Sequence, residues 1–259
     1  MMAAPPALRV VEHGARVYRR TWRGSVISCF LNPVLYLLAM GVGLGKLVDQ
    51  GSGTSTLALP YLTFLAPGLL AANAMQTAAG DASHPVMAGI KWRKTFHAAL
   101  ATPLGVRDLV WGHLGWVTIR ITFVSVVYAA IMTAFGATSP LEGLLSVPTA
   151  VLTGAAFAAA VTAYTARLKD ETGLSTLFRF GIVPLFLFSG TFFPVAQLPD
   201  WIEWLAYATP LFHGVSLCRG LALGVPFEVN PAVSAAYLVA WVVAGAWLSL
   251  RFMRRRLVL

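Results

Sequence analysis

Helix-breaking and charged residues interrupt a segment that is otherwise apolar enough to cross a membrane. The segment begins at Phe186-Leu-Phe-Ser-Gly-Thr-Phe-Phe-Pro194 and continues to Arg219-Gly220. Its breakers are Gly190, Pro194, Pro199 and Pro210, and its charged residues are Asp200, Glu203 and Arg219. Irregular backbone at membrane depth survives only where protein or a water-filled cavity covers it, because lipid cannot hydrogen-bond the freed groups. The interruption therefore predicts a pathway or a gate.

Sequence patterns for covalent, metal or nucleotide chemistry are missing. No Gly-x-x-x-x-Gly-Lys-Ser/Thr phosphate loop occurs, so any ATP has to be hydrolysed by another chain. The five histidines are scattered without metal-ligand spacing, and Ser189 lacks the glycines of a nucleophile motif. Asp81 is expected to pair with a neighbouring basic residue rather than to serve as an acid catalyst. We therefore expect no catalytic residue, metal or cofactor in this chain.

Polar and aromatic side chains that could contact a ligand fall in the second and fifth apolar stretches. Asn73, Gln76 and Thr77 lie about one helical turn apart, and such residues either join helices or line a path. The aromatic candidates are Phe186, Phe188, Phe192 and Phe193. An apolar lining with few polar groups suits lipid-linked or drug-like cargo. Packing of the fifth stretch against its neighbours explains the aromatic residues equally well.

The elements that position these residues are membrane spans. The chain has 259 residues with a mean hydropathy of +0.72, and 11% are charged, against about 25% in soluble domains. Six apolar stretches reach the roughly 20 residues that a helical span needs. We expect an all-α integral membrane protein with six transmembrane helices at 24–45, 57–80, 114–138, 143–166, 177–195 and 229–250.

The basic residues orient these spans, because short loops rich in Lys and Arg stay in the cytoplasm. Sixteen of the nineteen Lys and Arg residues fall on one side: Arg9, Arg16, Arg19, Arg20, Arg23, Lys91, Arg93, Lys94, Arg107, Arg167, Lys169, Arg179, Arg251, Arg254, Arg255 and Arg256. Both termini are therefore expected in the cytoplasm. Arg120, at the inner end of the third span, is expected to extend toward the cytoplasm. The net charge of +9 indicates contact with anionic membrane lipid, and nucleic acid is an unlikely partner.

Two further helices are expected at the cytoplasmic surface. Residues 1–23 show apolar positions at helical spacing and a cationic face, which predicts an amphipathic helix that anchors in lipid or docks a partner. Ser83-His84-Pro85 looks like a helix start, so a helix is expected at 86–100. That segment is too polar to span the membrane and too apolar to lie free in water.

These features resemble the permease subunit of ABC exporters of the ABC-2 type, especially the branch of nodulation-factor lipo-oligosaccharide exporters and daunorubicin-type drug exporters. The most specific match is the interrupted segment, where Phe188 to Pro194, Gln197-Leu-Pro199 and Arg219-Gly220 look like the family's signature. A second match is Ala98 to Leu104, followed by Arg107-Asp108 and Gly112.

The resemblance implies a half-transporter. Two six-span subunits, identical or homologous, would form the pore in a bacterial cytoplasmic membrane, and two separate cytoplasmic ABC ATPase subunits would hold ATP and Mg. Residues 86–100 would be the coupling helix that contacts the ATPase, through Met87, Ile90, Lys91, Trp92, Arg93, Lys94, Phe96 and Leu100. Residues 196–222 would form outer re-entrant helices, with a gate of Gly190, Phe192, Phe193, Pro194, Leu198, Pro199, Trp201, Pro210 and Arg219. Asn73, Gln76, Phe186 and Phe188 would contact the cargo.

One departure and several alternatives accompany this resemblance. Relatives often place an acidic residue in the coupling helix, whereas this chain has Lys91-Trp-Arg-Lys-Thr-Phe-His97. Pairing with an ATPase would then depend on positive charge or on Trp92 and Phe96. A glycan or glycolipid exporter would share the fold entirely. A membrane scaffold that docks an ATPase is disfavoured by the signature segment, and a channel by the lack of a filter sequence.

Overall fold

A computed structural model describes residues 5–46 and 59–258, and in these residues every regular element is a helix. In chain order, the long elements are α1 Pro6–Tyr36, α3 Tyr61–Met87, α5 Val106–Ala134, α6 Pro140–Arg167 and α11 Pro231–Leu257. The short ones are η1 Leu37–Leu44, η2 Ala88–Trp92, α4 Thr95–Leu100, α7 Thr172–Leu177, η3 Phe178–Ile182, α8 Val183–Phe188, η4 Val195–Gln197, α9 Asp200–Tyr207 and α10 Pro210–Leu223. The predicted all-α class is confirmed.

Three of these helices are long and apolar enough to span a membrane, namely α5, α6 and α11. Pro6–Gly24 and Cys29–Leu44 form a pair bent by 51°, which makes a fourth if it counts as one span. Polar residues such as Asn73 and Gln76 reduce the apolar character of α3, and the apolar helix Thr172–Phe188 is shorter than a full span. The chain is thus a multi-pass membrane protein in which three spans are unambiguous.

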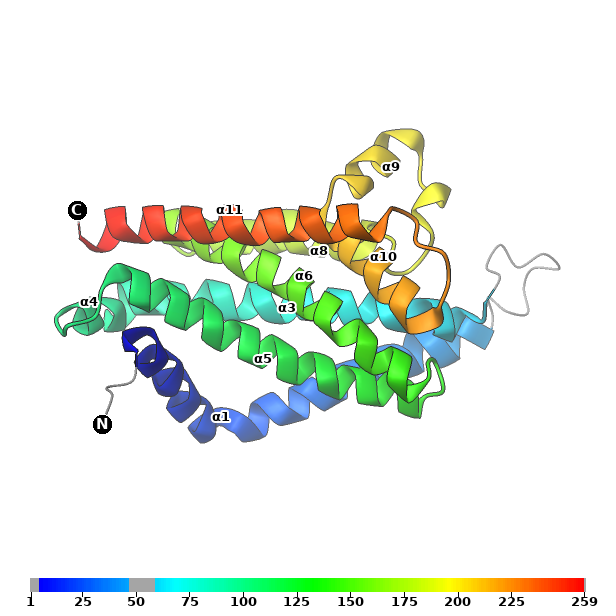
Figure 1. Cartoon of the computed structure of the whole chain (residues 1–259), viewed down its shortest axis with the longest axis horizontal. Coiled ribbons are helices and arrows are strands. Elements are labelled where there is room, and N and C mark those ends of the chain that lie inside the picture. Colours follow the sequence, from blue (N-terminus) through cyan, green and yellow to red (C-terminus); the bar gives the residue numbers. More distant parts are fainter. Residues whose placement is uncertain (1–4, 47–58, 259) are drawn as a thin grey trace.

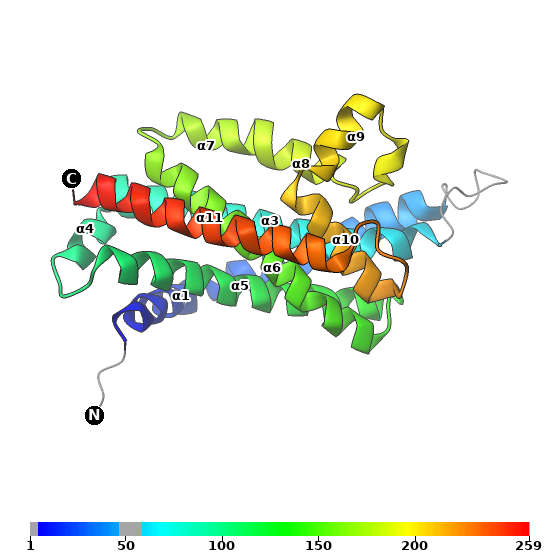
Figure 2. The same ribbon diagram turned by 45° about the horizontal axis from the view of Figure 1, so that its top comes forward.

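The long helices run side by side, with α6 in the middle of the bundle (Figure 1). α6 contacts α3, α5, α10 and α11, and its buried positions are mostly Ala, Gly and Thr. Ser249 on α11 donates a hydrogen bond to the Ala159 carbonyl of α6 at 3.0 Å. Small residues allow helices in lipid to approach closely, and this explains why the Ala-rich fourth apolar stretch is the central helix. α7 and α8 lie along one side of the bundle (Figure 2).

The two ends of the bundle differ. The first turn of α1, the short helix α4 and the last turn of α11 share one end, and α9 projects from the opposite end (Figure 1). α10 lies inside the bundle at that second end, with nearly all of its residues buried. The segment expected at 196–222 therefore forms one buried helix and one projecting helix.

The amino-terminal part of α1 packs on α5 as well as presenting a cationic face. The ring of Tyr18 contacts that of Trp116 edge-on, with centroids 5.9 Å apart. At Gly112 on α5, a Cβ atom would come 2.5 Å from Cβ of Val10 and 2.6 Å from the Ala7 carbonyl oxygen. α1 crosses α5 at this point, so the predicted amphipathic helix is fixed by an intramolecular contact.

The predicted helix start at Ser83-His84-Pro85 is wrong, because α3 continues through Pro85 to Met87. The chain then forms the π-helical turn η2 and breaks at Lys94, whose φ of 52° is left-handed, before α4 begins. Residues 86–100 therefore form the end of α3, the turn η2 and the short helix α4 rather than one helix. Similar π-helical turns lie near Pro33 and Pro184, consistent with local rearrangement of the hydrogen bonds that proline removes.

Replacing Gly112 with Ala should force α1 away from α5. We expect G112A to lose about 1–3 kcal/mol of stability, because neither the Ala7 backbone nor the branched Val10 can yield easily. The measurement is the thermal unfolding midpoint of the purified full chain. Gly115→Ala is the matched control, since its Cβ would meet Val11 at an ordinary 3.7 Å. Equal midpoints for the two variants would contradict this packing.

Candidate functional site

A polar cavity lies between α1, α3 and α5. Its volume is about 350 Å³, and its α3 wall carries Asn73, Gln76, Thr77 and Gly80, which share one helix face. Cys29 and Asn32 of α1 and Arg120 and Val124 of α5 complete most of the lining. In the described part of the chain, the side-chain amides of Asn73 and Gln76 make no hydrogen bond, although both residues are only partly exposed. Their donors and acceptors are therefore free to bind polar groups in the cavity.

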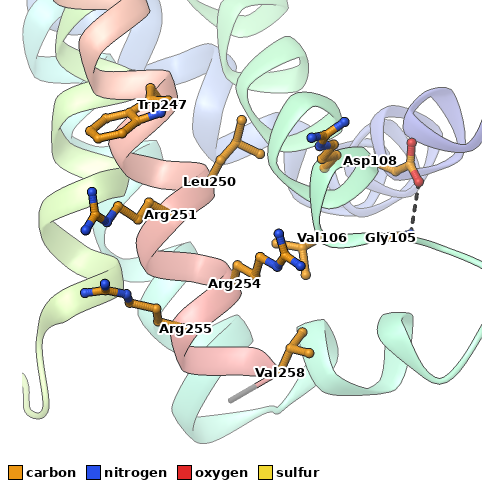
Figure 3. A pocket seen from close by; sticks show the side chains of 10 residues that line it. Gly105, Val106, Asp108, Trp247, Leu250, Arg251, Arg254, Arg255 and Val258 are labelled. Carbon is orange, nitrogen blue, oxygen red and sulfur yellow. Dashed lines mark hydrogen bonds between the residues drawn. The ribbon is translucent and has the colours of Figure 1, made fainter.

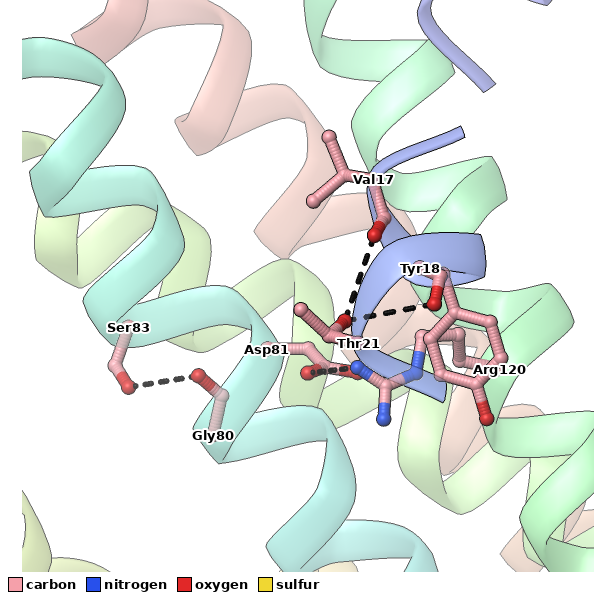
Figure 4. Close-up of polar contacts among 7 residues, drawn as sticks. All are labelled: Val17, Tyr18, Thr21, Gly80, Asp81, Ser83 and Arg120. Atoms are coloured by element: carbon pink, nitrogen blue, oxygen red, sulfur yellow. Dashed lines mark hydrogen bonds and ion pairs between the residues drawn. The ribbon is translucent and has the colours of Figure 1, made fainter. Parts of the chain in front are cut away.

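An ion pair closes one end of this cavity. Nη1 of Arg120 donates to Oδ1 of Asp81 at 2.8 Å, with side-chain exposures of 22% and 18% (Figure 4). The guanidinium of Arg120 also lies 5.0 Å from the centroid of the Tyr18 ring. The predicted pairing of Asp81 is confirmed. Arg120, which was expected to extend toward the cytoplasm, thus has a partner of opposite charge on the neighbouring helix.

A second cavity lies on the other side of the same ion pair. It measures about 270 Å³ and is lined by residues of α1, α3, α4 and α5 that include His13, Arg93 and Phe96. Asp81 and Arg120 line both cavities. Oδ2 of Asp81 is buried and has no hydrogen-bond partner among the described residues. The ion pair is therefore a partition between two spaces, and one of its oxygen atoms is still free to accept a hydrogen bond.

Aromatic side chains line a narrow space that adjoins the polar cavity at Asn73 and Gln76. Phe186 of α8 contacts Tyr36 edge-on at 5.9 Å and Phe192 at 5.0 Å, between ring centroids. Phe186, Asn73 and Gln76 line one narrow space of about 10 Å³ with Tyr36. Three of the four predicted cargo residues thus meet at one place. Phe188 does not join them: its side chain is 40% exposed and lines neither cavity.

The predicted outer gate centres on Arg219. Its side chain is buried in α10, and it donates to the carbonyl oxygen of Gly190 at 2.8 Å and to that of Phe64 at 3.4 Å. It also donates to Oε1 of Glu228 at 3.1 Å and lies 3.9 Å from the centroid of the Phe64 ring. The guanidinium of Arg219 therefore connects α10 with α3, with the turn after α8 and with the loop that precedes α11.

The other predicted gate residues surround this contact to different degrees. Gly190 has a φ of 79°, a conformation that favours glycine, and Pro210 is buried at the start of α10. The partly buried members are Phe192, Phe193, Pro194 and Leu198. Pro199 is exposed at the start of α9, and Trp201 is 70% exposed on that projecting helix. Trp201 is thus remote from the contacts of Arg219.

The predicted ATPase-contact residues also divide into two groups. Met87 and Ile90 are buried in the bundle, whereas Lys91, Trp92, Arg93 and Lys94 are exposed on the turn. Phe96 is partly buried, lies over Gly89 and contacts the His113 ring at 6.4 Å between centroids. Leu100 is partly buried at the end of α4. The exposed face of this segment is therefore cationic with one large aromatic ring.

Sequence reasoning missed the partners of the two arginines. Glu228 is the only acidic residue after Glu203, and this isolation was an available signal. Tyr18 lies in the predicted amphipathic helix, and nothing in its spacing pointed to Arg120. Phe64 contributes a ring face and a backbone carbonyl, which no residue pattern reveals.

A polytopic helical bundle with a polar cavity among its helices and a partly buried ion pair beside that cavity is typical of a membrane permease. Residues 10–223 match the family model described as ABC-2 type transporter. The chain is 31% identical over 252 residues to Nodulation protein J of Sinorhizobium fredii, with 93% of each chain covered. It is 29% identical to Nodulation protein J of Rhizobium leguminosarum bv. viciae, over 97% of this chain and 95% of the relative.

A further relative is the inner membrane transport permease YadH of Escherichia coli, 23% identical over 227 residues, or 86% of each chain. The chain belongs to the ABC-2 type transporter family.

Replacing Arg219 with Lys should loosen the second end of the bundle. The amine keeps the charge but cannot reach the Gly190 and Phe64 carbonyls and Glu228 together, so R219K should lose about 1.5–3 kcal/mol. Glu228→Gln should cost less, because the Glu228 side chain is 38% exposed. Thermal unfolding of both purified variants checks the order. A larger loss in E228Q than in R219K would contradict the central position of Arg219.

Proposed function

We propose that this protein is the membrane-spanning subunit of an ATP-driven exporter that moves an amphiphilic, drug-like or lipid-linked molecule outward from the cytoplasm or the inner leaflet. Its membership of the ABC-2 type transporter family supports the transport class. The observation that carries the proposal is the polar cavity of Asn73 and Gln76, which borders the Asp81–Arg120 ion pair on one side and adjoins the narrow space lined by Phe186. A small polar space beside aromatic side chains suits a molecule with a polar group and an apolar body.

The proposed topology has six spans with both termini in the cytoplasm. The proposed spans are the second part of α1 together with η1, then α3, α5, α6, α7 together with α8, and α11. The single bundle end shared by the start of α1, α4 and the end of α11 supports this arrangement, as does the distribution of Lys and Arg. A bacterial cytoplasmic membrane is the proposed location.

The proposed partners are a second permease subunit, identical or homologous, and two copies of a cytoplasmic ABC ATPase that holds ATP and Mg. The exposed turn Lys91 to Lys94 is the proposed ATPase contact. Buried Met87 and Ile90 tie that turn to α3, so a force on the turn reaches the wall of the polar cavity. ATP can shift the permease only through contacts that differ between its two states, and this turn supplies such contacts.

A glycolipid is the second candidate cargo. The cavity presents the amides of Asn32, Asn73 and Gln76 and the hydroxyl of Thr77, which match the hydroxyl and amide groups of a sugar. Similarity to relatives named Nodulation protein J supports this candidate, because the sequence resembles the branch of nodulation-factor lipo-oligosaccharide exporters. The two candidates differ in whether the polar amides or the aromatic side chains dominate binding.

Replacing Trp92 with Ala should uncouple the permease from its ATPase. The side chain is 46% exposed, so W92A should insert and fold normally while retaining at most about a tenth of the co-purified ATPase from native membranes. Trp111→Ala is the matched control, because Trp111 is 53% exposed on the first turns of α5. Full ATPase recovery and hydrolysis with W92A would exclude the turn as the contact.

Replacing Asn73 and Gln76 with Leu should change which cargo is accepted. In the complex reconstituted in lipid nanodiscs, ATP hydrolysis is measured with an added anthracycline or an acylated oligosaccharide. If a glycolipid is carried, N73L/Q76L should abolish stimulation by the oligosaccharide, because its polar groups lose their partners. Phe188→Ala, outside the cavity, should leave stimulation unchanged. Normal stimulation in N73L/Q76L by every active compound would refute a cargo role for the cavity.

A further inference from the structure

A large open cleft separates the beginning of α5 from the end of α11, away from the polar cavity. Its volume is about 1000 Å³. Gly105, Val106, Arg107 and Asp108 line one side, and the last three turns of α11 line the other (Figure 3). The α11 residues are Trp247, Leu250, Arg251, Arg254 and Arg255, and Val258 directly follows the helix.

The cleft has a strong excess of positive charge. Four arginines border it: Arg107, Arg251, Arg254 and Arg255. In the part of the chain that the structure describes, none of the four forms an ion pair or a hydrogen bond. Asp108 is the acidic residue of the lining, and its Oδ2 already accepts the backbone N–H of Gly105 at 2.9 Å. The guanidinium groups therefore lack a protein counter-charge.

The arginine distribution contrasts with other arginines of the bundle. Arg120 and Arg219 are each paired with a carboxylate, and Arg256, next to Arg255, donates to the Ala166 carbonyl of α6 at 2.9 Å. Those side chains have structural partners. The unpaired guanidiniums at the cleft are instead available for bidentate contact with an anion such as a phosphate, the geometry that arginine favours.

An apolar stripe on α11 leads directly to these charges. Val239, Val243, Trp247, Arg251 and Arg255 recur every four residues, so each lies next to the following one in a row that winds gradually around the helix. Val239, Val243 and Trp247 are 48%, 63% and 56% exposed. The guanidinium of Arg251 lies 5.4 Å from the centroid of the Trp247 ring. An exposed apolar ridge that ends in two cations is complementary to a lipid, whose acyl chain is joined to an anionic head group.

We propose that this cleft binds the phosphate head group of an anionic phospholipid, with an acyl chain along Val239, Val243 and Trp247. A lipid fits better than the ATPase, because the ridge continues up a membrane-spanning helix. The site is separate from the proposed cargo cavity and from the turn Lys91 to Lys94.

The test uses the purified full chain in a neutral detergent, with phosphatidylglycerol as the probe and native mass spectrometry as the readout. The wild type should retain phosphatidylglycerol in preference to phosphatidylcholine. R251Q/R255Q should weaken this retention on the order of tenfold or more, since two cations near the head group are lost. R251K/R255K keeps the charge but loses the planar fork, so it should weaken retention several-fold.

The matched control is R19Q/R20Q, which removes two exposed charges from α1. It should bind phosphatidylglycerol as the wild type does. An equal loss in the control, or full retention in both variants at Arg251 and Arg255, would overturn the proposal in favour of general surface charge.

Two further arms separate other ligands. Inorganic phosphate and dihexanoyl phosphatidylglycerol are added as competitors, and both should compete much less well than the long-chain lipid, because they lack an acyl chain that follows the ridge. Competition by inorganic phosphate as strong as by the lipid would indicate a soluble phosphate ligand and overturn the proposal. So would unchanged lipid retention in R251Q/R255Q combined with loss of the ATPase.

Discussion

The whole structure depends on how backbone polar groups are satisfied where the helices break inside an apolar bundle. Each unsatisfied carbonyl in such surroundings costs free energy comparable to a lost hydrogen bond, so a break needs a donor. Arg219 supplies one at the turn containing Gly190, and it reaches the Phe64 carbonyl at the start of α3 as well. Glu228 and the Phe64 ring balance the charge that this donor brings. The sharp turn after α8 and the burial of α10 are consequences of that arrangement.

α3 is the element that connects the two charged contacts. Phe64 meets Arg219 near one end of this helix, and Asp81 meets Arg120 nearer the other. Asn73 and Gln76 lie between them, facing the polar cavity. Because Met87 and Ile90 are buried, the turn beyond α3 is fixed to the same helix. In the proposed coupling, a displacement of that turn would reach the wall of the cavity and the Asp81–Arg120 pair through α3.

The sequence predicted which residues line the site better than it predicted which residues contact one another. Asn73, Gln76 and Phe186 were selected by polarity, spacing and aromatic character, and they meet because their helices pack side by side. A basic partner for Asp81 was predicted, but the sequence did not identify it as Arg120, because the residue across from a charge depends on how the helices pack. The helix start at Ser83 to Pro85 failed because local capping signals were overridden by a continuous buried helix face. The contacts of Arg219 with two backbone carbonyls leave no trace in residue identity at all.

Arg219 and the arginines at the cleft differ in burial and in their partners, and this difference has a physical reason. Arg219 is buried and surrounded by a carboxylate, two carbonyls and a ring, because a buried charge without compensation would be too costly. Arg251, Arg254 and Arg255 are exposed beside an open cleft, where water can solvate them at little cost. Solvation of these arginines does not explain why the apolar ring of Trp247 lies beside them. That ring lowers the cost of bringing an amphiphilic anion into the cleft, because its apolar part is buried in the same step as its charge is paired.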